Sequence, residues 1–161
     1  MKRIFSLSFL TCLYFIPVFS QAVPGDAAVS WFTTTRISEN VIRISDHGTD
    51  NMYLVIGNQK AMLIDNGLGV ANIRDFVKTL SSLPLIVVIT HGHPDHAGAN
   101  YQFREVYINP DGMAMATGYN SLPKKSGGAA GIMTGGAKVP ENELFKDTLN
   151  HKIILPSLTF S

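Results

Sequence analysis

The sequence predicts an α/β (α+β) domain built on a mixed β-sheet. Runs of β-branched and aromatic residues, separated by short polar turns, fill the stretch from Val29 to Asp65 and indicate hairpins. An amphipathic helical pattern and then an uninterrupted apolar run follow this stretch. Because strand, helix and strand alternate through the middle of the chain, we expect a mixed sheet that carries helices.

The first 22 residues have the pattern of a secretory signal peptide. Two basic residues precede an uncharged apolar stretch, Ile4 to Phe19, and small residues suit cleavage after Ala22. The apolar stretch is short for a membrane span, which needs roughly 20 apolar residues. An uncleaved N-terminal anchor is the alternative. We therefore expect an exported protein, periplasmic or extracellular, whose mature chain (residues 23–161) has no membrane span.

The composition of the mature chain excludes several kinds of site and partner. Cys12 is the only cysteine and lies within the expected signal, so we expect neither a disulfide nor a thiolate metal ligand. Without the signal, basic and acidic residues nearly balance, which gives no indication of nucleic acid or of an anionic membrane surface as a partner. The length suffices for one domain with a hydrophobic core.

Four strands are expected first. Val29–Ile37 and Asn40–Ser45 form one pair around the polar turn Ser38-Glu39, and Asn51–Ile56 and Ala61–Asp65 form a second pair. These runs are rich in β-branched and aromatic residues, which favour strands.

A helix and a buried strand are expected next. A turn at 66–69 breaks the fourth strand, and the following helix ends at Leu83-Pro84. Its apolar residues recur at helical spacing: Val70, Ile73, Phe76, Val77 and Leu80. The run Leu85–Ile89, LIVVI, has no alternation, which suits a strand buried on both faces.

Shorter elements are expected to complete the domain. Small residues from Ala97 to Asn100 predict the beginning of a helix that approaches the sheet closely. Glu105–Asn109 is an expected strand, and Pro110–Tyr119 is an expected helix with its proline near the start.

The character of the chain changes after Tyr119. Residues 120–140 are rich in glycine, and we expect a long loop that covers a site or is disordered. No Gly-Lys-Ser/Thr ending follows, which excludes a phosphate-binding P-loop. A helical turn within Glu141–Asp147 and a strand at Lys152–Leu155 are expected last.

The stretch THGHPDHAGA, Thr90 to Ala99, contains three of the five histidines and an aspartate directly after LIVVI. His91 and His93 are two residues apart, so in an extended segment both imidazoles point to one side and can converge on one ion. Asp95 and His96 lie where the chain turns into a helix, so we expect them to point toward a second ion.

This donor set predicts a metal site with hydrolytic chemistry. Two cations roughly 3.5–4 Å apart can hold a water, lower its pKa and polarise a carbonyl or phosphoryl oxygen. Imidazole and carboxylate ligands suit zinc, with iron or manganese as alternatives. The other interpretation is a polar loop whose histidines cap a helix or face solvent, but four ligand-type residues in six positions favour the metal.

The sequence HGHPDH resembles the His-x-His-x-Asp-His motif of the metallo-β-lactamase-fold superfamily, mostly hydrolases with two metal ions. NMYLVIG, AMLIDNG and VVITHGHPDHAGA resemble the family's consecutive strands and its metal loop. The resemblance covers roughly Val41 to Asn109, which is the first half of a family domain. It implies an αββα sandwich in which each half supplies part of the site.

The resemblance also implies roles for individual residues. It assigns His91 and His93 to the first metal and Asp95 and His96 to the second, with Asp95 orienting the attacking nucleophile and accepting a proton. Asp65 is similar to the aspartate that supports the metal loop from behind.

The chain departs from the family pattern near its end. Complete members have a later histidine in a Gly-His turn, then a bridging aspartate and a final histidine. His151 lacks that turn, and His47 is expected in a solvent-exposed loop, with a position facing the site as the alternative. We therefore expect a domain truncated to its N-terminal half.

The function implied is a metal-dependent hydrolase of a small molecule, with zinc as the expected metal. An ester, lactone, thioester, β-lactam or phosphoester would be attacked by metal-activated water, and a β-lactamase or a lactonase fits equally well. The alternative is a truncated, non-catalytic fragment that binds metal weakly or folds poorly alone. Such a fragment would leave one sheet face uncovered and open to self-association.

Overall fold

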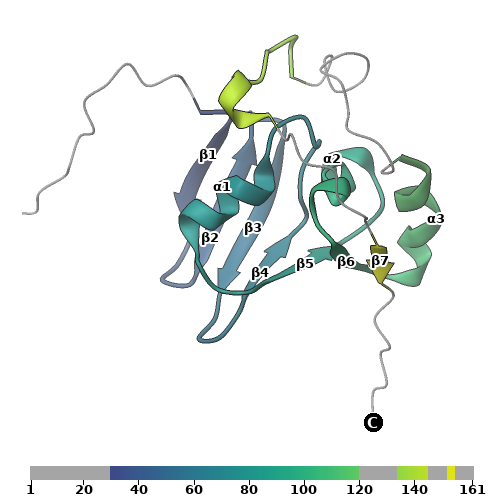
Figure 1. Cartoon of the computed structure of the whole chain (residues 1–161), viewed down its shortest axis with the longest axis horizontal. Coiled ribbons are helices and arrows are strands. Elements are labelled where there is room, and N and C mark those ends of the chain that lie inside the picture. Colours follow the sequence, from purple (N-terminus) through teal and green to yellow (C-terminus); the bar gives the residue numbers. More distant parts are fainter. Residues whose placement is uncertain (1–29, 120–133, 145–151, 155–161) are drawn as a thin grey trace, which may run out of the picture.

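The computed structural model describes residues 30–119, 134–144 and 152–154 (Figure 1). One seven-stranded sheet runs through these residues in the order β1-β2-β3-β4-β5-β6-β7. The strands from β1 to β4 pair antiparallel, and those from β4 to β7 pair parallel. The predicted α/β class and mixed sheet are confirmed.

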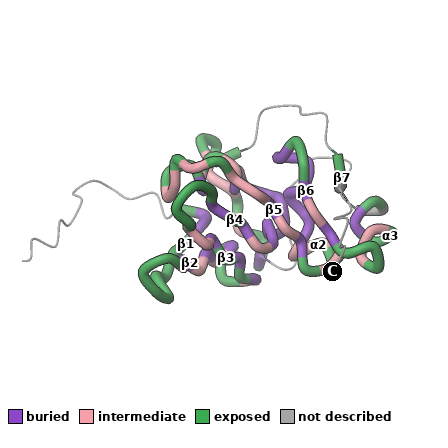
Figure 2. Tube along the Cα trace, turned by 90° about the horizontal axis from the view of Figure 1, so that it is seen from below, coloured by how far each residue is buried: buried purple, intermediate pink, exposed green. Residues whose placement is uncertain are grey.

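The antiparallel part forms where the alternating sequence predicts it, with strand ends shifted by a few residues. Buried side chains occupy every second position, such as Ile42, Ile44, Met52 and Leu54, because successive side chains of a strand point to opposite faces. Figure 2 shows that the hairpin ends are exposed. The four strands are β1 (Phe32–Arg36), β2 (Val41–Asp46), β3 (Asp50–Ile56) and β4 (Ala61–Ile64).

Helix α1 (Ile73–Leu80) crosses one face of this sheet (Figure 1). The apolar spacing predicted a start at Val70, but the helix begins three residues later because Asn72 is its N-cap. The Asn72 side chain accepts a 3.1 Å hydrogen bond from the backbone N–H of Asp75. Ile73 and Val77 are buried and join the core.

Strand β5 (Leu85–Ile89) lies between β4 and β6 (Glu105–Ile108). Val87 and Ile89 are buried, but Ile86 and Val88 are only partly buried. The prediction that this strand is buried on both faces is wrong for the described structure. The pairing register places Ile86 beside Met62 on the opposite face, where Met62 is exposed. Self-association through this face stays a prediction.

The segment after β5 differs from the prediction. Helix α2 (Pro94–Ala97) ends at Ala97, where the sequence predicted a helix to begin, and a 3₁₀ turn (Asn100–Gln102) follows Gly98. The reason is that Pro94 has its φ angle preset for the first helical position, so the helix starts within the histidine loop. Helix α3 (Pro110–Tyr119) and β6 form where predicted.

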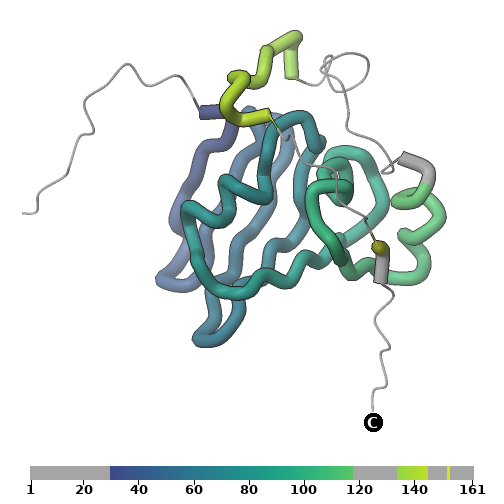
Figure 3. Tube along the Cα trace, viewed as in Figure 1, coloured from purple at the N-terminus to yellow at the C-terminus, as the bar shows by residue number. Residues whose placement is uncertain are grey.

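The remaining described segments lie at opposite ends of the sheet, one beside its start and one along its last edge. The segment 134–144 includes a 3₁₀ turn, Glu141–Glu143, and the Glu143 carboxylate accepts a 2.9 Å hydrogen bond from the backbone N–H of Trp31. Figure 3 shows this segment in yellow-green above α1. Strand β7 (Lys152–Ile154) pairs with β6. The predicted helical turn and last strand are confirmed over these residues.

Some predictions fall outside the described residues. These are the signal peptide (1–22), residues 120–133 of the glycine-rich stretch, and His151. Over the ranges that the structure describes, no helix is both long enough and apolar enough to cross a membrane.

Candidate metal centre

The histidine loop begins at the carboxyl end of β5, beside the carboxyl end of β4. Because the two strands pair in parallel, Asp65, which follows β4, and Thr90, which follows β5, come out at the same edge of the sheet. Asp65 has a φ angle of +60°, in the left-handed region that is uncommon for residues other than glycine. This conformation ends β4 and turns the Asp65 carboxylate under the loop.

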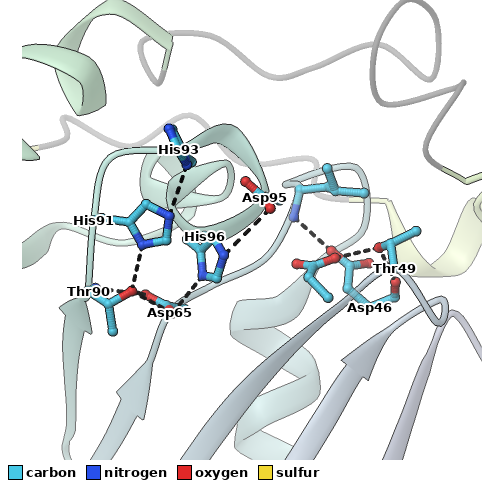
Figure 4. A network of polar contacts seen from close by, with 10 residues as sticks. Asp46, Thr49, Asp65, Thr90, His91, His93, Asp95 and His96 are labelled. Carbon is cyan, nitrogen blue, oxygen red and sulfur yellow. Dashed lines mark hydrogen bonds and ion pairs between the residues drawn. The ribbon is translucent and has the colours of Figure 1, made fainter.

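The buried carboxylate of Asp65 contacts two separate parts of the histidine loop (Figure 4). Its Oδ1 accepts a 2.8 Å hydrogen bond from the backbone N–H of Thr90, and the Thr90 hydroxyl lies 2.9 Å from Oδ2. Oδ2 is also 2.8 Å from Nδ1 of His96. The family resemblance predicted that Asp65 supports this loop. In the structure, the residues that Asp65 contacts in the loop are Thr90 and His96.

The contacts of Thr90 assign the tautomer of His91. The single Thr90 hydroxyl proton is donated to Asp65, so the hydroxyl oxygen accepts from Nδ1 of His91, 3.0 Å away. Nε2 of His91 then carries a lone pair and accepts from Nδ1 of His93 at 3.0 Å. A chain of hydrogen bonds therefore runs from Asp65 through Thr90 to both histidines.

The three imidazole rings form one cluster (Figure 4). The ring centroids of His91 and His93 are 4.7 Å apart, as expected for residues on one side of an extended segment, and those of His91 and His96 are 4.1 Å apart. The loop thus brings His96 against His91 instead of pointing it away. Oδ2 of Asp95 lies 3.5 Å from Nε2 of His96.

His47 lies outside this cluster. It is exposed, as predicted, in the turn between β2 and β3, and its ring stacks on that of Trp31 with centroids 4.4 Å apart.

The loop suits a metal ion by its donor chemistry. Imidazole nitrogens and a carboxylate are common zinc ligands, and the hydrogen bond from Nδ1 of His96 to Asp65 leaves its Nε2 with a lone pair. In the described part of the chain, no three His, Cys, Asp or Glu side chains are arranged to hold an ion as they stand. An ion shared by His91 and His93 would replace the hydrogen bond between them. The donor types and tautomers fit a metal, and the assignment of ligands stays a prediction.

The loop after β4 holds the histidine loop in place through Asn66. Its backbone N–H donates to the carbonyl of His96 at 2.9 Å, and its side-chain oxygen accepts from the backbone N–H of Ala99 at 2.9 Å. Its amide nitrogen donates to the side chain of Asn100 at 2.7 Å. Asn66 and Asn100 are both buried, so these bonds satisfy the Asn66 side chain and Oδ1 of Asn100, which water does not reach.

Two glycines allow these loops to approach backbone to backbone. A Cβ at Gly69 would lie 2.2 Å from the carbonyl oxygen of Gly98, and a Cβ at Gly98 would lie 2.3 Å from the carbonyl oxygen of Leu68. The small residues around Gly98 thus allow a close approach to the loop after β4, whereas the sequence predicted an approach to the sheet.

A pocket of about 310 Å³ opens beside the histidine loop, toward the start of α3. His91 and His93 form one side of it. Its lining residues are Thr90, His91, Gly92, His93, Asn109, Asp111, Gly112 and Met115.

Comparison with known families supports the resemblance found in the motif. A family model described as the metallo-beta-lactamase superfamily matches residues 46–155, which include β2 to β7 and the whole histidine loop. The chain belongs to this superfamily.

Similar proteins include curated acyl-coenzyme A thioesterases named MBLAC2. The chicken (Gallus gallus) protein is 29% identical over 97 residues, which cover 52% of this chain and 35% of that protein. The human (Homo sapiens) protein is 27% identical over 112 residues, which cover 58% of this chain and 40% of that protein. The chain thus spans well under half the length of these relatives.

Solved structures of the superfamily are also similar over part of their length. A metallo-beta-lactamase from Hirschia baltica has a TM-score of 0.49 at 15% identity, covering 58% of this chain and 50% of that one. A metallo-beta-lactamase from Erythrobacter litoralis has a TM-score of 0.48 at 17% identity, and the match covers 59% of this chain and 49% of that one.

Two buried carboxylates beside the superfamily motif were missed from the sequence. Asp46, 1% exposed, accepts a 2.7 Å hydrogen bond from the backbone N–H of Leu68 and another from the indole N–H of Trp31. Asp50, 7% exposed, accepts from the Thr49 hydroxyl through Oδ1. Burial raises the pKa of both carboxyls, that of Asp50 to about 7.

The sequence did contain a signal for these two positions. Asp46 continues the series of buried alternate residues Ile42 and Ile44, and Asp50 begins the series that continues with Met52. Period-two alternation places all of them on the same sheet face.

Proposed function

We propose that this protein is a metal-dependent hydrolase that binds zinc through His91, His93, Asp95 and His96. Superfamily membership supports the reaction class. The observation that carries the proposal is the position of Asp65, whose buried carboxylate contacts His96 directly and is linked to His91 through Thr90. One group thereby orients imidazoles from both predicted metal positions.

The protein's own groups have distinct roles in this proposal. Bound zinc would supply Lewis acidity and a lowered pKa for the attacking water. Asp65 holds His96 with the proton on Nδ1, which keeps Nε2 free to ligate. Asp95, whose Oδ2 is 3.5 Å from Nε2 of His96, orients the water and accepts its proton.

We propose a thioester as the substrate class to test first. The support is the similarity to curated relatives named acyl-coenzyme A thioesterases. The pocket of about 310 Å³ beside His91 and His93 falls at the small end of the range for ligand sites, which supports a small substrate group at the metal loop. Esters, lactones, β-lactams and phosphoesters are the competing classes.

A second candidate is a non-catalytic protein that binds metal weakly. The observation that favours it is that the described ligand-type side chains do not converge on an ion as they stand. The rings of His91 and His93 are hydrogen-bonded to each other.

The experiment is a substrate panel assayed with and without zinc. The chain is stripped with a chelator, zinc is added back, and initial rates are measured with an acyl-coenzyme A thioester, a lactone, a β-lactam and a phosphodiester. Zinc-dependent thioester hydrolysis that His96→Ala abolishes is the expected result. Zinc binding without turnover of any substrate would favour the second candidate, and turnover that needs neither zinc nor His96 would overturn the first.

We also propose that the protein is exported, because residues 1–22 have the pattern of a signal peptide. N-terminal sequencing of the protein from the producing cell should begin at Val23. An intact Met1 in the cytoplasmic fraction alone would contradict export.

A further inference from the structure

The Asp50 carboxyl group contains a buried oxygen without a hydrogen-bond partner in the described structure. Oδ1 accepts from the Thr49 hydroxyl, whereas Oδ2 contacts no donor there. The residue is only 7% exposed, so water has little access to this oxygen. Burying a polar atom without a hydrogen bond costs free energy. Since nearly all buried polar groups in proteins are paired, this oxygen requires an explanation.

The surroundings of Asp50 are rich in negative charge. Asp46 lies directly opposite in the β2–β3 pairing, and its charge raises the pKa of Asp50. Asp95 in α2 also raises the pKa of Asp50, whereas His96 lowers it. Asp46, Asp95 and His96 thus all act electrostatically on the Asp50 carboxyl group, in addition to its burial.

The position of Asp50 connects this acidic group to the histidine loop. Helix α2 contacts β3, the strand that begins with Asp50. In Figure 4, Asp95 lies between the three histidines and the residues Asp46 and Thr49, whose hydroxyl donates to Asp50. Asp50 therefore belongs to the strand that is contacted by α2, the helix that carries Asp95 and His96.

We propose that Asp50 is the buried counter-charge of a cation held at Asp95 and His96. The inference rests on the metal-dependent function proposed above. In this proposal Asp50 is a positioning residue and not a ligand, because it acts on the cation through its charge. A divalent cation would offset the charge of two of these three carboxylates, of which Asp46 and Asp50 are buried.

A purely structural role for Asp50 predicts a different behaviour. If the carboxylate only accepts from Thr49 to hold the hairpin turn, replacing it should lower stability and leave metal affinity unchanged. If it is a counter-charge, its ionised form is unfavourable without the cation, so a neutral amide should leave the zinc-free protein at least as stable while weakening zinc binding.

The experiment compares Asp50→Asn with the unchanged chain at pH 7.5. Zinc affinity is measured by competition with a chromophoric chelator, and the thermal unfolding midpoint is measured in zinc-free buffer. We expect roughly 10-fold weaker zinc binding, at the low end of the effects of groups behind metal ligands, with an unchanged or higher zinc-free midpoint. Thr49→Val, which removes the hydrogen bond and keeps the charge, should retain zinc affinity. Asp75→Asn, which removes an exposed carboxylate on α1, should leave zinc affinity unchanged.

Each other outcome overturns the inference. Unchanged zinc affinity in folded Asp50→Asn would assign Asp50 a structural role and leave the proposed function standing. Absence of zinc binding by the unchanged chain would overturn this inference and the proposed metal site together. If Asp50→Asn does not fold, Asp50→Ser removes the charge with less volume, and the same zinc measurement decides.

Discussion

Oδ2 of Asp65 lies 2.8 Å from Nδ1 of His96, and the same carboxylate accepts hydrogen bonds from Thr90. This relationship joins the end of β4 to both the beginning and the helical part of the histidine loop. It also makes His96 donate from Nδ1, which leaves Nε2 as its lone-pair nitrogen. The geometry of the predicted ligands therefore depends on a residue that is not itself one of them.

Asp65→Ala should weaken zinc binding by about 10–100-fold, because loss of a group that orients a ligand typically has this effect. Zinc affinity is measured by chelator competition on protein whose circular dichroism matches that of the unchanged chain. Asp75→Ala is the control, since Asp75 is an exposed carboxylate that interacts with Lys78 on α1. Equal zinc affinity of folded Asp65→Ala and the unchanged chain would reject this role.

His93→Ala and His96→Ala should each lower zinc-dependent hydrolysis by more than the 10²–10⁴-fold usual for a positioned acid or base, because each removes a predicted metal ligand. Initial rates at saturating zinc provide the measurement. His47→Ala, which removes an exposed ring stacked on Trp31, should keep a rate close to that of the unchanged chain. A rate lost equally in all three variants would argue against the ligand assignment.

Gly69→Ala should destabilise the protein more than Gly136→Ala. The two glycines have nearly the same φ angle, +76° and +77°, but a Cβ at Gly69 would lie 2.2 Å from the carbonyl oxygen of Gly98, whereas a Cβ at Gly136 would have nothing within 4 Å. The left-handed conformation alone costs about 1–2 kcal/mol for a non-glycine residue. Urea unfolding of both variants measures the difference, and equal losses would show that the loop contact is not tight.

The contribution of Asp50 should make the zinc-free protein less stable as the pH rises. Burial raises the pKa of Asp50 from 3.8 to about 7, so the unfolded chain releases this proton more easily than the folded one. The contribution is therefore most favourable below about pH 4 and is lost between about pH 4 and 7. Urea unfolding between about pH 4 and 7 should show that the free energy of unfolding falls less for Asp50→Asn than for the unchanged chain. Parallel pH profiles would contradict the prediction.

The location of the site could be predicted from the sequence because its signal is local. His91, His93, Asp95 and His96 lie within six consecutive positions after an apolar run, and both the strand and the loop depend on neighbouring residues. The start of α2 was misplaced because the sequence interpretation gave the small residues after His96 more weight than the preset φ of Pro94.

The acidic pair shows the limit of local reasoning. The alternation of β2 and β3 places Asp46 and Asp50 on the inward face, but charged residues are rarely fully buried, so residue type argued against burial. Their burial follows from the pairing of β2 with β3, which sets Asp46 opposite Asp50, and from Leu68 and Trp31, which donate to Asp46.

By itself, the sequence determined the mixed sheet, most of its strands and the presence of the histidine loop at the end of β5, because periodicity and strand propensity act over a few residues. Only the tertiary structure decided how that loop is held. Asp65 and His96 are far apart in the chain and meet because β4 and β5 pair in parallel, which brings the carboxyl ends of both strands to one edge of the sheet. Contacts of this kind depend on strand pairing between distant segments, and local sequence patterns do not specify that pairing.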